Sequence, residues 1–303
     1  MSASQTTHST IIAWLDHLDR TGKSPHTQAA YRRALVHFVQ WSETTYGQAF
    51  DPAQIIGRDV ADWRAFQQTV EQAKPATINQ RLTALSRFCA WAVAEKIMAS
   101  DPTAHTKSLA PEPRQPKGLT EPDLRRLLRA VHAGGNGRDV AMIELLAGTG
   151  LRVSELLALK VGDVDIHARS GKVIVRKGKH GNYRTVPLTA PVRTAMDAYL
   201  DSHPGWENPK AALWLGERGA LRDRSAVTRI LDKYALVSRL EQLGPHTLRH
   251  TFATRYLDAN SGDLRGLAAL LGHASLDTVM IYTEPREEEL ARRVERVEQS
   301  NPL

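Results

Sequence analysis

The chain has 303 residues, of which 42% are hydrophobic and 24% charged, a composition typical of a globular protein long enough for two domains. Its 40 Lys and Arg residues outnumber 33 Asp and Glu residues, and the resulting net charge of +7 favours a polyanionic partner. The single cysteine, Cys89, excludes an internal disulfide and a cluster of thiolate metal ligands. The sequence has neither a long apolar run nor a signal-like N-terminus, so we expect no membrane association and a cytoplasmic location.

The first hundred residues predict an all-helical domain. Apolar residues recur with helical spacing in four stretches, residues 8–20, 26–45, 58–70 and 76–96. Thr27 and Thr77 each precede a basic helix, whose first N–H groups are suited to hold phosphates. Four arginines on the polar faces of these helices are either solvated or contact the polyanion: Arg32, Arg33, Arg81 and Arg87.

Four prolines fall within residues 101–118, and this composition disfavours both helix and strand. The segment therefore predicts a linker between an N-terminal domain, residues 1–100, and a second domain, residues 119–303.

The second domain is predicted to be mainly helical with one small β-hairpin. The first helix covers residues 120–131, the second covers residues 139–147 and ends at a Gly-Thr-Gly turn, and Arg152 begins the third. Residues 172–176 and 183–188 predict two strands joined by a glycine-containing turn. Helical patterns resume at residues 190–202, 225–240, 247–258, 264–271, 276–282 and 287–299.

Candidate residues for chemistry lie in this second half. A phosphodiester under nucleophilic attack gains negative charge, and a guanidinium suits that charge because it stays protonated and offers paired donors. Arg152 and Arg249 are the candidates, although an isolated Arg is most often a surface residue. Tyr282 is a candidate nucleophile if positive charge and a proton acceptor lie near it, although most tyrosines simply pack their rings.

The motifs that contain these residues resemble the tyrosine recombinase family, which includes phage integrases and Xer-like recombinases. The matching segments agree with the family in order, spacing and flanking residues: Gly148-Thr149-Gly150-Leu151-Arg152, His246-Thr247-Leu248-Arg249-His250, Leu270-Leu271-Gly272-His273 and Ile281-Tyr282. The resemblance is specific over about residues 118–285. In residues 1–100 only the four-helix pattern matches.

The resemblance implies a role for each matching residue. Tyr282, nine positions after His273, would attack the phosphate, and His273 would donate a hydrogen bond to it. His246 would orient or deprotonate the nucleophile. Lys179 would protonate the leaving 5′ oxygen, with Lys177 as second choice because His180 follows Lys179 where the family pattern normally has glycine. The catalytic set is then Arg152, Lys179, His246, Arg249, His273 and Tyr282; Glu155 would brace Arg152 or its helix, and His250 would brace the fold of the site.

The resemblance also implies an architecture and partners. We expect a mainly α fold with a small β-sheet in the catalytic domain, and a two-domain, C-shaped DNA clamp made of a helical SAM-like core-binding domain and a catalytic domain. Thr27, Thr77 and the four N-terminal arginines would then contact DNA. The partners would be double-stranded DNA, near the nucleoid, and further copies or a paralogue in a tetramer on two sites. The helix at 287–299 would dock on a neighbouring subunit, although it is equally suited to fold back on its own domain.

No cofactor is expected, because the chain has no phosphate-binding Gly-x-x-x-x-Gly-Lys loop and no His-Glu-x-x-His metal motif. Two other functions share parts of this pattern: a topoisomerase-like enzyme that reseals one duplex without exchange, and a catalytically silent DNA-binding protein on the same scaffold. The short segment ahead of residue 8 favours a simple recombinase, of the Xer, transposon-resolvase or small-integrase kind, over a large phage integrase.

Overall fold

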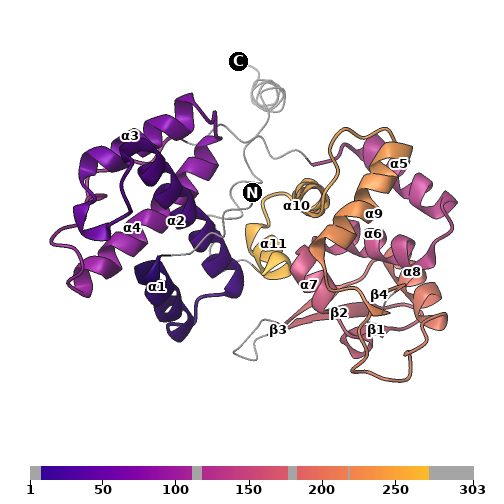
Figure 1. Cartoon of the computed structure of the whole chain (residues 1–303). Coiled ribbons are helices and arrows are strands. Elements are labelled where there is room, and N and C mark those ends of the chain that lie inside the picture. Colours follow the sequence, from indigo (N-terminus) through magenta and orange to yellow (C-terminus); the bar gives the residue numbers. More distant parts are fainter. Residues whose placement is uncertain (1–7, 111–117, 177–182, 218, 273–303) are drawn as a thin grey trace, which may run out of the picture. The chain divides into compact units, whose positions relative to one another are not determined.

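The computed structural model describes residues 8–110, 118–176, 183–217 and 219–272. The chain divides into two compact units, Met1–Arg114 and Gln115–Leu303 (Figure 1). The boundary between the units falls inside residues 101–118, the segment predicted to be a linker.

The first unit is built from four α-helices, as the periodicity predicted. They are α1 (Ser9–Arg20), α2 (Pro25–Tyr46), α3 (Gly57–Thr69) and α4 (Pro75–Ala94), with a short 3-10 helix, η1 (Pro52–Gln54), between α2 and α3. Aromatic rings form its core: Phe38 meets Trp63 edge to face with ring centroids 5.0 Å apart, and Trp14 meets Phe88 at 5.6 Å. Cys89 is buried in this core.

The starts of α2 and α4 differ from the prediction. Pro25 and Pro75 occupy the first position of each helix, where the missing N–H of proline needs no partner. The prediction that Thr27 and Thr77 precede these helices is therefore wrong, because both lie in the first helical turn. The backbone N–H of Thr27 already donates to Ser24 Oγ at 3.1 Å.

The beginning of the predicted linker packs against the first unit. The side-chain amide of Asn79 on α4 donates to the carbonyl of Leu109 and accepts from its N–H, both at 2.8 Å. Arg64 on α3 donates to the carbonyl of Lys107 at 3.1 Å. Residues up to Leu109 are thus held by side chains of α3 and α4.

The second unit combines helices with two small antiparallel sheets. Its helices are α5 (Glu121–Ala133), α6 (Gly137–Thr149), α7 (Val153–Ala158), the 3-10 helix η2 (Val161–Asp163), α8 (Ala190–Asp201), α9 (Arg224–Val237), α10 (Pro245–Ala259) and α11 (Leu264–Leu271). The strands are β1 (Val164–Ile166), β2 (Gly171–Arg176), β3 (Tyr183–Pro187), β4 (Leu215–Gly216) and β5 (Gly219–Ala220). The helices predicted at 276–282 and 287–299 lie outside the described residues.

The predicted hairpin is confirmed by the pairing of β2 with β3, in which Val173 lies opposite Val186. The sequence did not predict β1, which pairs with the other edge of β2, nor the β4–β5 hairpin. These strands could not be predicted, because strands of two or three residues are too short to show an alternation of apolar and polar side chains.

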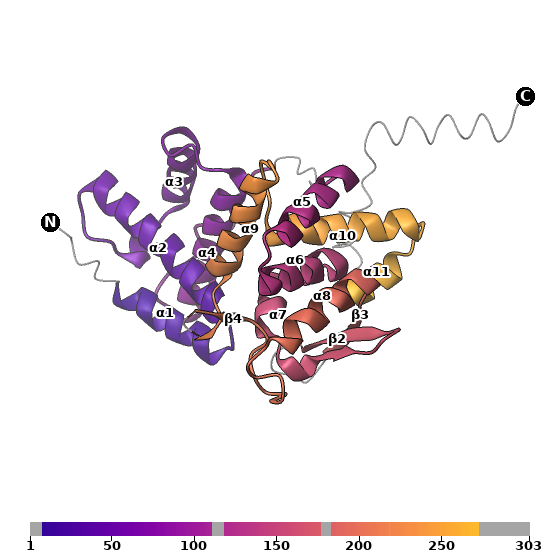
Figure 2. The ribbon, with the colours of Figure 1, turned by 90° about the vertical axis from the view of Figure 1, so that its right-hand side faces the viewer.

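Helix α6 lies at the centre of the second unit and positions the residues that follow it. It carries buried side chains on several faces, including Ile143 and Leu146, and packs against α8 and α10 (Figure 2). The buried carboxylates of Asp139 and Glu144 on α6 pair with Arg138 and His132. Since α6 is enclosed by its neighbours, the turn at its C-terminal end is held in a fixed place.

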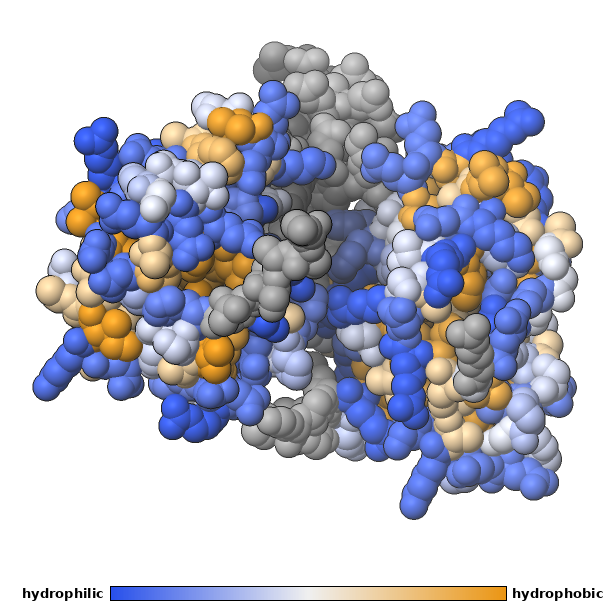
Figure 3. Space-filling model, in the orientation of Figure 1, coloured by the Kyte–Doolittle hydropathy of each residue, from blue (hydrophilic) through white to orange (hydrophobic). Residues whose placement is uncertain are grey.

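The visible faces of both units mix hydrophilic residues with small groups of hydrophobic ones (Figure 3). Within the described ranges, the structure has no helix that is both long and apolar enough to cross a membrane.

Candidate active site

The turn between α6 and α7 places Arg152. Gly150 ends α6 with φ +63°, a left-handed conformation that favours glycine. A Cβ at this position would lie 2.6 Å from Phe252 Cδ1 and 2.8 Å from Leu271 Cδ2, so neighbouring side chains also require glycine here. Arg152 follows as the N-cap of α7.

Glu155, one turn into α7, holds Arg152 at two points. Its carboxylate accepts from the Arg152 backbone N–H at 2.9 Å and from Arg152 Nη1 at 3.1 Å. Glu155 thus contacts both the backbone and the side chain of Arg152. The Arg152 side chain remains 38% exposed.

Arg249 reaches the same place from α10. It is 4% exposed; its Nη1 donates to the carbonyl of Gly150 at 2.6 Å and its Nη2 to the carbonyl of Leu271 at 3.0 Å. Arg152 Nη1 also donates to the Leu271 carbonyl, at 3.3 Å. The two arginines that the sequence singled out therefore converge on one carbonyl oxygen at the C-terminal end of α11.

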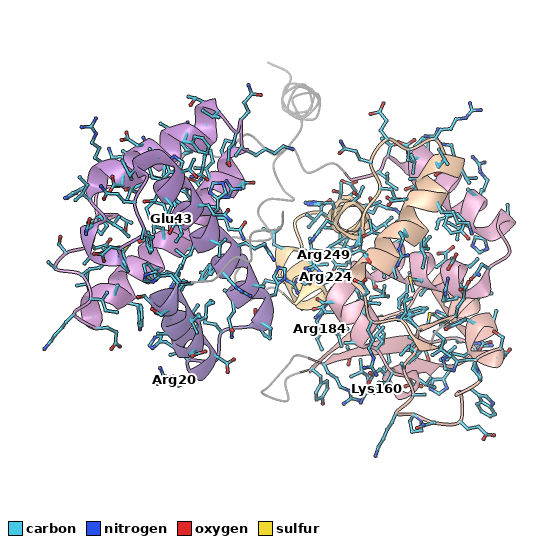
Figure 4. The ribbon with its side chains drawn as sticks, viewed as in Figure 1. Arg20, Glu43, Lys160, Arg184, Arg224 and Arg249 are labelled. Atoms are coloured by element: carbon cyan, nitrogen blue, oxygen red, sulfur yellow. The ribbon has the colours of Figure 1, made fainter. Side chains whose placement is uncertain are left out.

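A third arginine, Arg184 on β3, belongs to this cluster and was not predicted. Both its Nη atoms donate to the Glu155 carboxylate at 2.8 Å, and its Nε donates to the carbonyl of Leu270 at 2.7 Å. Figure 4 labels Arg184 and Arg249 within the second unit. The sequence held one signal: Arg184 stands two residues before buried Val186 in a strand, and residues two apart share a face.

The electrostatics of Glu155 follow from these contacts. Burial of the carboxyl raises its pKa, but hydrogen bonds from Arg184 and from the Arg152 backbone outweigh burial and hold the pKa at about 2. Glu155 is therefore an anion throughout the physiological range, and it links the charges of Arg152 and Arg184.

The two histidines near Arg249 have different environments. Pro245 begins α10, and exposed His246 lies in its first turn, one turn before Arg249 and on the same side of the helix. His250 is partly buried, and its pKa is lowered by burial and by the nearby charges of His246 and Arg249. Both effects favour the neutral form of His250.

Three of the six predicted catalytic residues, Lys179, His273 and Tyr282, lie outside the described residues, as does Lys177. The other three are described, and hydrogen bonds bring Arg152 and Arg249 together. The described part of the chain contains no group of three or more His, Cys, Asp or Glu side chains arranged to hold a metal ion.

The arginines of the first unit that are predicted to contact DNA differ in how exposed their side chains are. Arg33 and Arg87 are exposed on α2 and α4, and Arg32 is exposed beside Arg33. Arg81 is only partly exposed, and it donates to Glu71 at 2.7 Å and to Gln67 at 3.1 Å, so its charge is shared with an acidic partner. Its role in DNA contact, like that of Thr27 and Thr77, stays a prediction.

Comparison with known families identifies the class of protein. Residues 117–289 match the phage integrase family, and residues 11–96 match the phage integrase N-terminal SAM-like domain. The second match covers the helical first unit, and the first covers the unit that contains the arginine cluster. The chain therefore belongs to the phage integrase family, which confirms the resemblance seen in its motifs.

Curated relatives narrow this class. The chain is 37% identical over 283 residues to tyrosine recombinase XerD of Ralstonia nicotianae, covering 91% of this chain and 88% of the relative. It is 34% identical over 287 residues to tyrosine recombinase XerC of Neisseria gonorrhoeae, covering 92% of each. The chain is a tyrosine site-specific recombinase, as predicted.

Solved structures share the fold. The XerA recombinase is 26% identical with a TM-score of 0.53, covering 98% of this chain and 99% of that one. The XerH site-specific recombinase, bound to palindromic difH substrate in a post-cleavage complex, has a TM-score of 0.74 at 20% identity, covering 98% of this chain and 91% of that one. The predicted mainly α fold with a small antiparallel sheet is confirmed.

Proposed function

We propose that this chain cleaves and rejoins double-stranded DNA at specific sites, with Tyr282 as the nucleophile. The phenol oxygen attacks the scissile phosphorus as its proton passes to a base, and the bond to the 5′ oxygen breaks as that oxygen gains a proton. A 3′-phosphotyrosyl ester then holds one end while the other carries a 5′-hydroxyl. The 5′-hydroxyl of a partner strand reverses the step. Because the ester conserves the bond energy, no nucleotide hydrolysis is required.

The observation that carries this proposal is the convergence of Arg152 and Arg249 on the carbonyl of Leu271. Two guanidiniums near one acceptor can bind the two non-bridging oxygens of a phosphate as its charge rises during attack. The acceptor lies two positions before His273 in the sequence, which supports the assignment of His273 as a further hydrogen-bond donor to the same phosphate.

The remaining roles follow the family pattern. His246 orients Tyr282 or takes its proton, and Lys179 gives a proton to the 5′ oxygen, with Lys177 as the alternative. Glu155 supports Arg152 through its two hydrogen bonds, and His250 supports the fold around Arg249.

We assign DNA contact outside the active site to the first unit. Exposed Arg33 and Arg87 lie on its two basic helices, α2 and α4, where their charges are accessible to phosphates. Exchange of strands between two sites requires four active sites, so we propose a tetramer on DNA in which the segment 287–299 joins neighbouring subunits. With two DNA-binding units per subunit, the chain is expected to close around a duplex as a clamp.

The test begins by finding the DNA. Genomic fragments retained by the Tyr282→Phe variant supply candidate sites, because this variant keeps the DNA-binding groups and loses only the nucleophile. Nicked duplexes made from these sites trap a covalent adduct, because the short strand beyond the nick diffuses away after cleavage. The wild-type chain is expected to form an adduct at Tyr282 and release a free 5′-hydroxyl. The Tyr282→Phe variant is expected to form none.

Tyr256→Phe is the matched control. Tyr256 lies on α10 and donates to Asp263 at 2.7 Å, so its loss should leave the adduct intact. An adduct mapped to another residue would reassign the nucleophile, and the absence of any adduct on tightly bound sites would contradict cleavage. A two-site plasmid separates recombination from topoisomerase action: recombination requires both sites, whereas relaxation of a plasmid that has one site does not.

A further inference from the structure

The C-terminal end of α11 is surrounded by arginines. The last carbonyls of a helix have no partner within the helix and carry its partial negative charge. Here Leu270 accepts from Arg184 at 2.7 Å, while Leu271 accepts from Arg249 at 3.0 Å and Arg152 at 3.3 Å. Three guanidiniums therefore contact the end of this helix.

Arg184 differs from Arg152 in how fully its donors are engaged. Its side chain is 9% exposed, against 38% for Arg152. Its Nη1 and Nη2 both contact Glu155, and its Nε contacts the carbonyl of Leu270. Because Nε, Nη1 and Nη2 of Arg184 all donate to groups within the fold, Arg184 is poorly placed to bind a phosphate itself.

Arg184 joins three elements that are far apart in the sequence. It lies on β3, it grips Glu155 on α7, and Glu155 in turn holds the backbone and guanidinium of Arg152. Through the carbonyl of Leu270, Arg184 also fixes the helix end that aligns Arg152 and Arg249. A shift of Arg184 would therefore move both Glu155 and the end of α11, the two groups that contact Arg152.

We propose that Arg184 is a positioning residue for DNA cleavage: it holds Glu155 and the end of α11 in the places that aim Arg152 and Arg249 at the scissile phosphate. This inference rests on the proposed function, because it assigns Arg184 a part in that reaction. Misplacement of a charged group by about an ångström slows an enzymatic step by on the order of 100-fold, whereas substrate binding far from the site is unaffected.

Gly272 makes the close approach of Arg184 to α11 sterically feasible. It ends α11 with φ +64°, and a Cβ there would lie 2.6 Å from Arg184 Nη1 and 2.9 Å from its Cζ. An alanine at this position would push the guanidinium away from the helix end. Gly272→Ala thus disturbs Arg184 while leaving its side chain chemically intact.

Two substitutions of Arg184 test the proposal. Arg184→Lys keeps the charge but loses the paired donors, and Arg184→Gln loses the charge as well. Both are expected to bind the cognate DNA within about twofold of wild type and to form the covalent adduct roughly 10- to 100-fold more slowly. Arg193→Gln is the control, because Arg193 on α8 also donates to a backbone carbonyl, that of Leu188 at 3.0 Å, outside the cluster.

A second substrate separates positioning from general damage to the fold. In a methylphosphonate, a methyl group replaces one non-bridging oxygen of the scissile phosphate, so the reacting centre carries one negative charge fewer for Arg152 and Arg249 to neutralise. If Arg184 acts through those arginines, the difference in rate between wild type and Arg184→Gln should shrink to about threefold or less on this substrate. An equal loss on both substrates would show a merely structural role and overturn the proposal, as would an unchanged rate on ordinary DNA.

Gly272→Ala provides a second test of the positioning role of Arg184 if the arginine variants do not fold. Its control is Gly262→Ala, at a position with φ +79° and no atom within 4 Å of the added Cβ. Gly272→Ala should slow adduct formation relative to this control, and the difference should again shrink on the methylphosphonate. Equal rates for the two glycine variants would contradict the proposal. If wild-type protein itself formed no adduct, the proposed function would fail instead, so the two failures are distinguishable.

Discussion

Replacing Gly150 by alanine should destabilise the second unit by an amount that its surroundings allow us to work out. An alanine in the left-handed conformation is strained by about 1 kcal/mol. The added Cβ would also lie 2.6 Å from Phe252 Cδ1 and 2.8 Å from Leu271 Cδ2, and overpacking of this kind costs about 1–3 kcal/mol. We therefore expect Gly150→Ala to lower the free energy of unfolding by roughly 2–4 kcal/mol.

Gly135→Ala isolates the collision from the backbone strain. Gly135 has φ +66°, close to the +63° of Gly150, but no atom lies within 4 Å of a Cβ built there. This control should lose only the strain of about 1 kcal/mol. In scanning calorimetry the two variants should then differ by about 2 kcal/mol, or roughly 4–8 °C in the transition of the second unit.

Activity should separate the two variants further. The carbonyl of Gly150 accepts from Arg249, and Leu271, which the new Cβ would push, carries the carbonyl shared by Arg249 and Arg152. Gly150→Ala should therefore slow adduct formation, whereas Gly135→Ala should not. Equal losses of stability in the two variants, or an unchanged cleavage rate in Gly150→Ala, would refute the reasoning from close contacts.

Three further outcomes follow from other contacts. The pKa of Glu155 is about 2 in the folded chain, against an ordinary value of 4.5. The ionised carboxylate therefore stabilises the fold fully above about pH 4.5, and this contribution to the free energy of unfolding is lost as the pH falls towards 2. The free energy of unfolding of Glu155→Gln should depend less on pH in this range. Burial raises the pKa of the Cys89 thiol to about 12, so a disulfide reagent should modify it no faster than the first unit opens, and rapid labelling under native conditions would contradict this. Asn79→Ala removes both hydrogen bonds to Leu109 and should accelerate tryptic cleavage after Lys107, while Thr83→Ala, one turn further along α4, should not.

The sequence predicted the helices well because each carries its signals locally. Apolar periodicity places the starts of α2 and α4 within one turn, and the Thr120 cap marks the start of α5. It also predicted Arg152 and Arg249, whose flanking residues carry the family pattern. The convergence of these two arginines on one carbonyl was beyond the sequence, since it depends on where α10 and α11 pack.

The role of Arg184 shows most clearly what the sequence leaves out. Read alone, Tyr183-Arg184-Thr185 describes a polar strand, and nothing in it indicates that Glu155 and Leu270 lie beside Arg184 in space. Arg81 is a second case: the sequence placed it on the polar face of a helix, and the structure adds that Glu71 and Gln67 accept hydrogen bonds from it. In both residues a tertiary contact, which no local pattern encodes, sets the environment of the charge.

Apart from the Glu155 carboxylate, the groups that hold the arginine cluster in place are invisible to side-chain mutagenesis. Arg249 and Arg184 rest on the carbonyls of Gly150, Leu270 and Leu271, which every amino acid would supply equally. An alanine scan of α11 would shorten the leucines and leave these acceptors present, so it would report packing and miss the anchoring. Replacing a single peptide bond by an ester, which weakens the carbonyl as an acceptor, would expose a part of the active site that lies in the backbone rather than in any residue type.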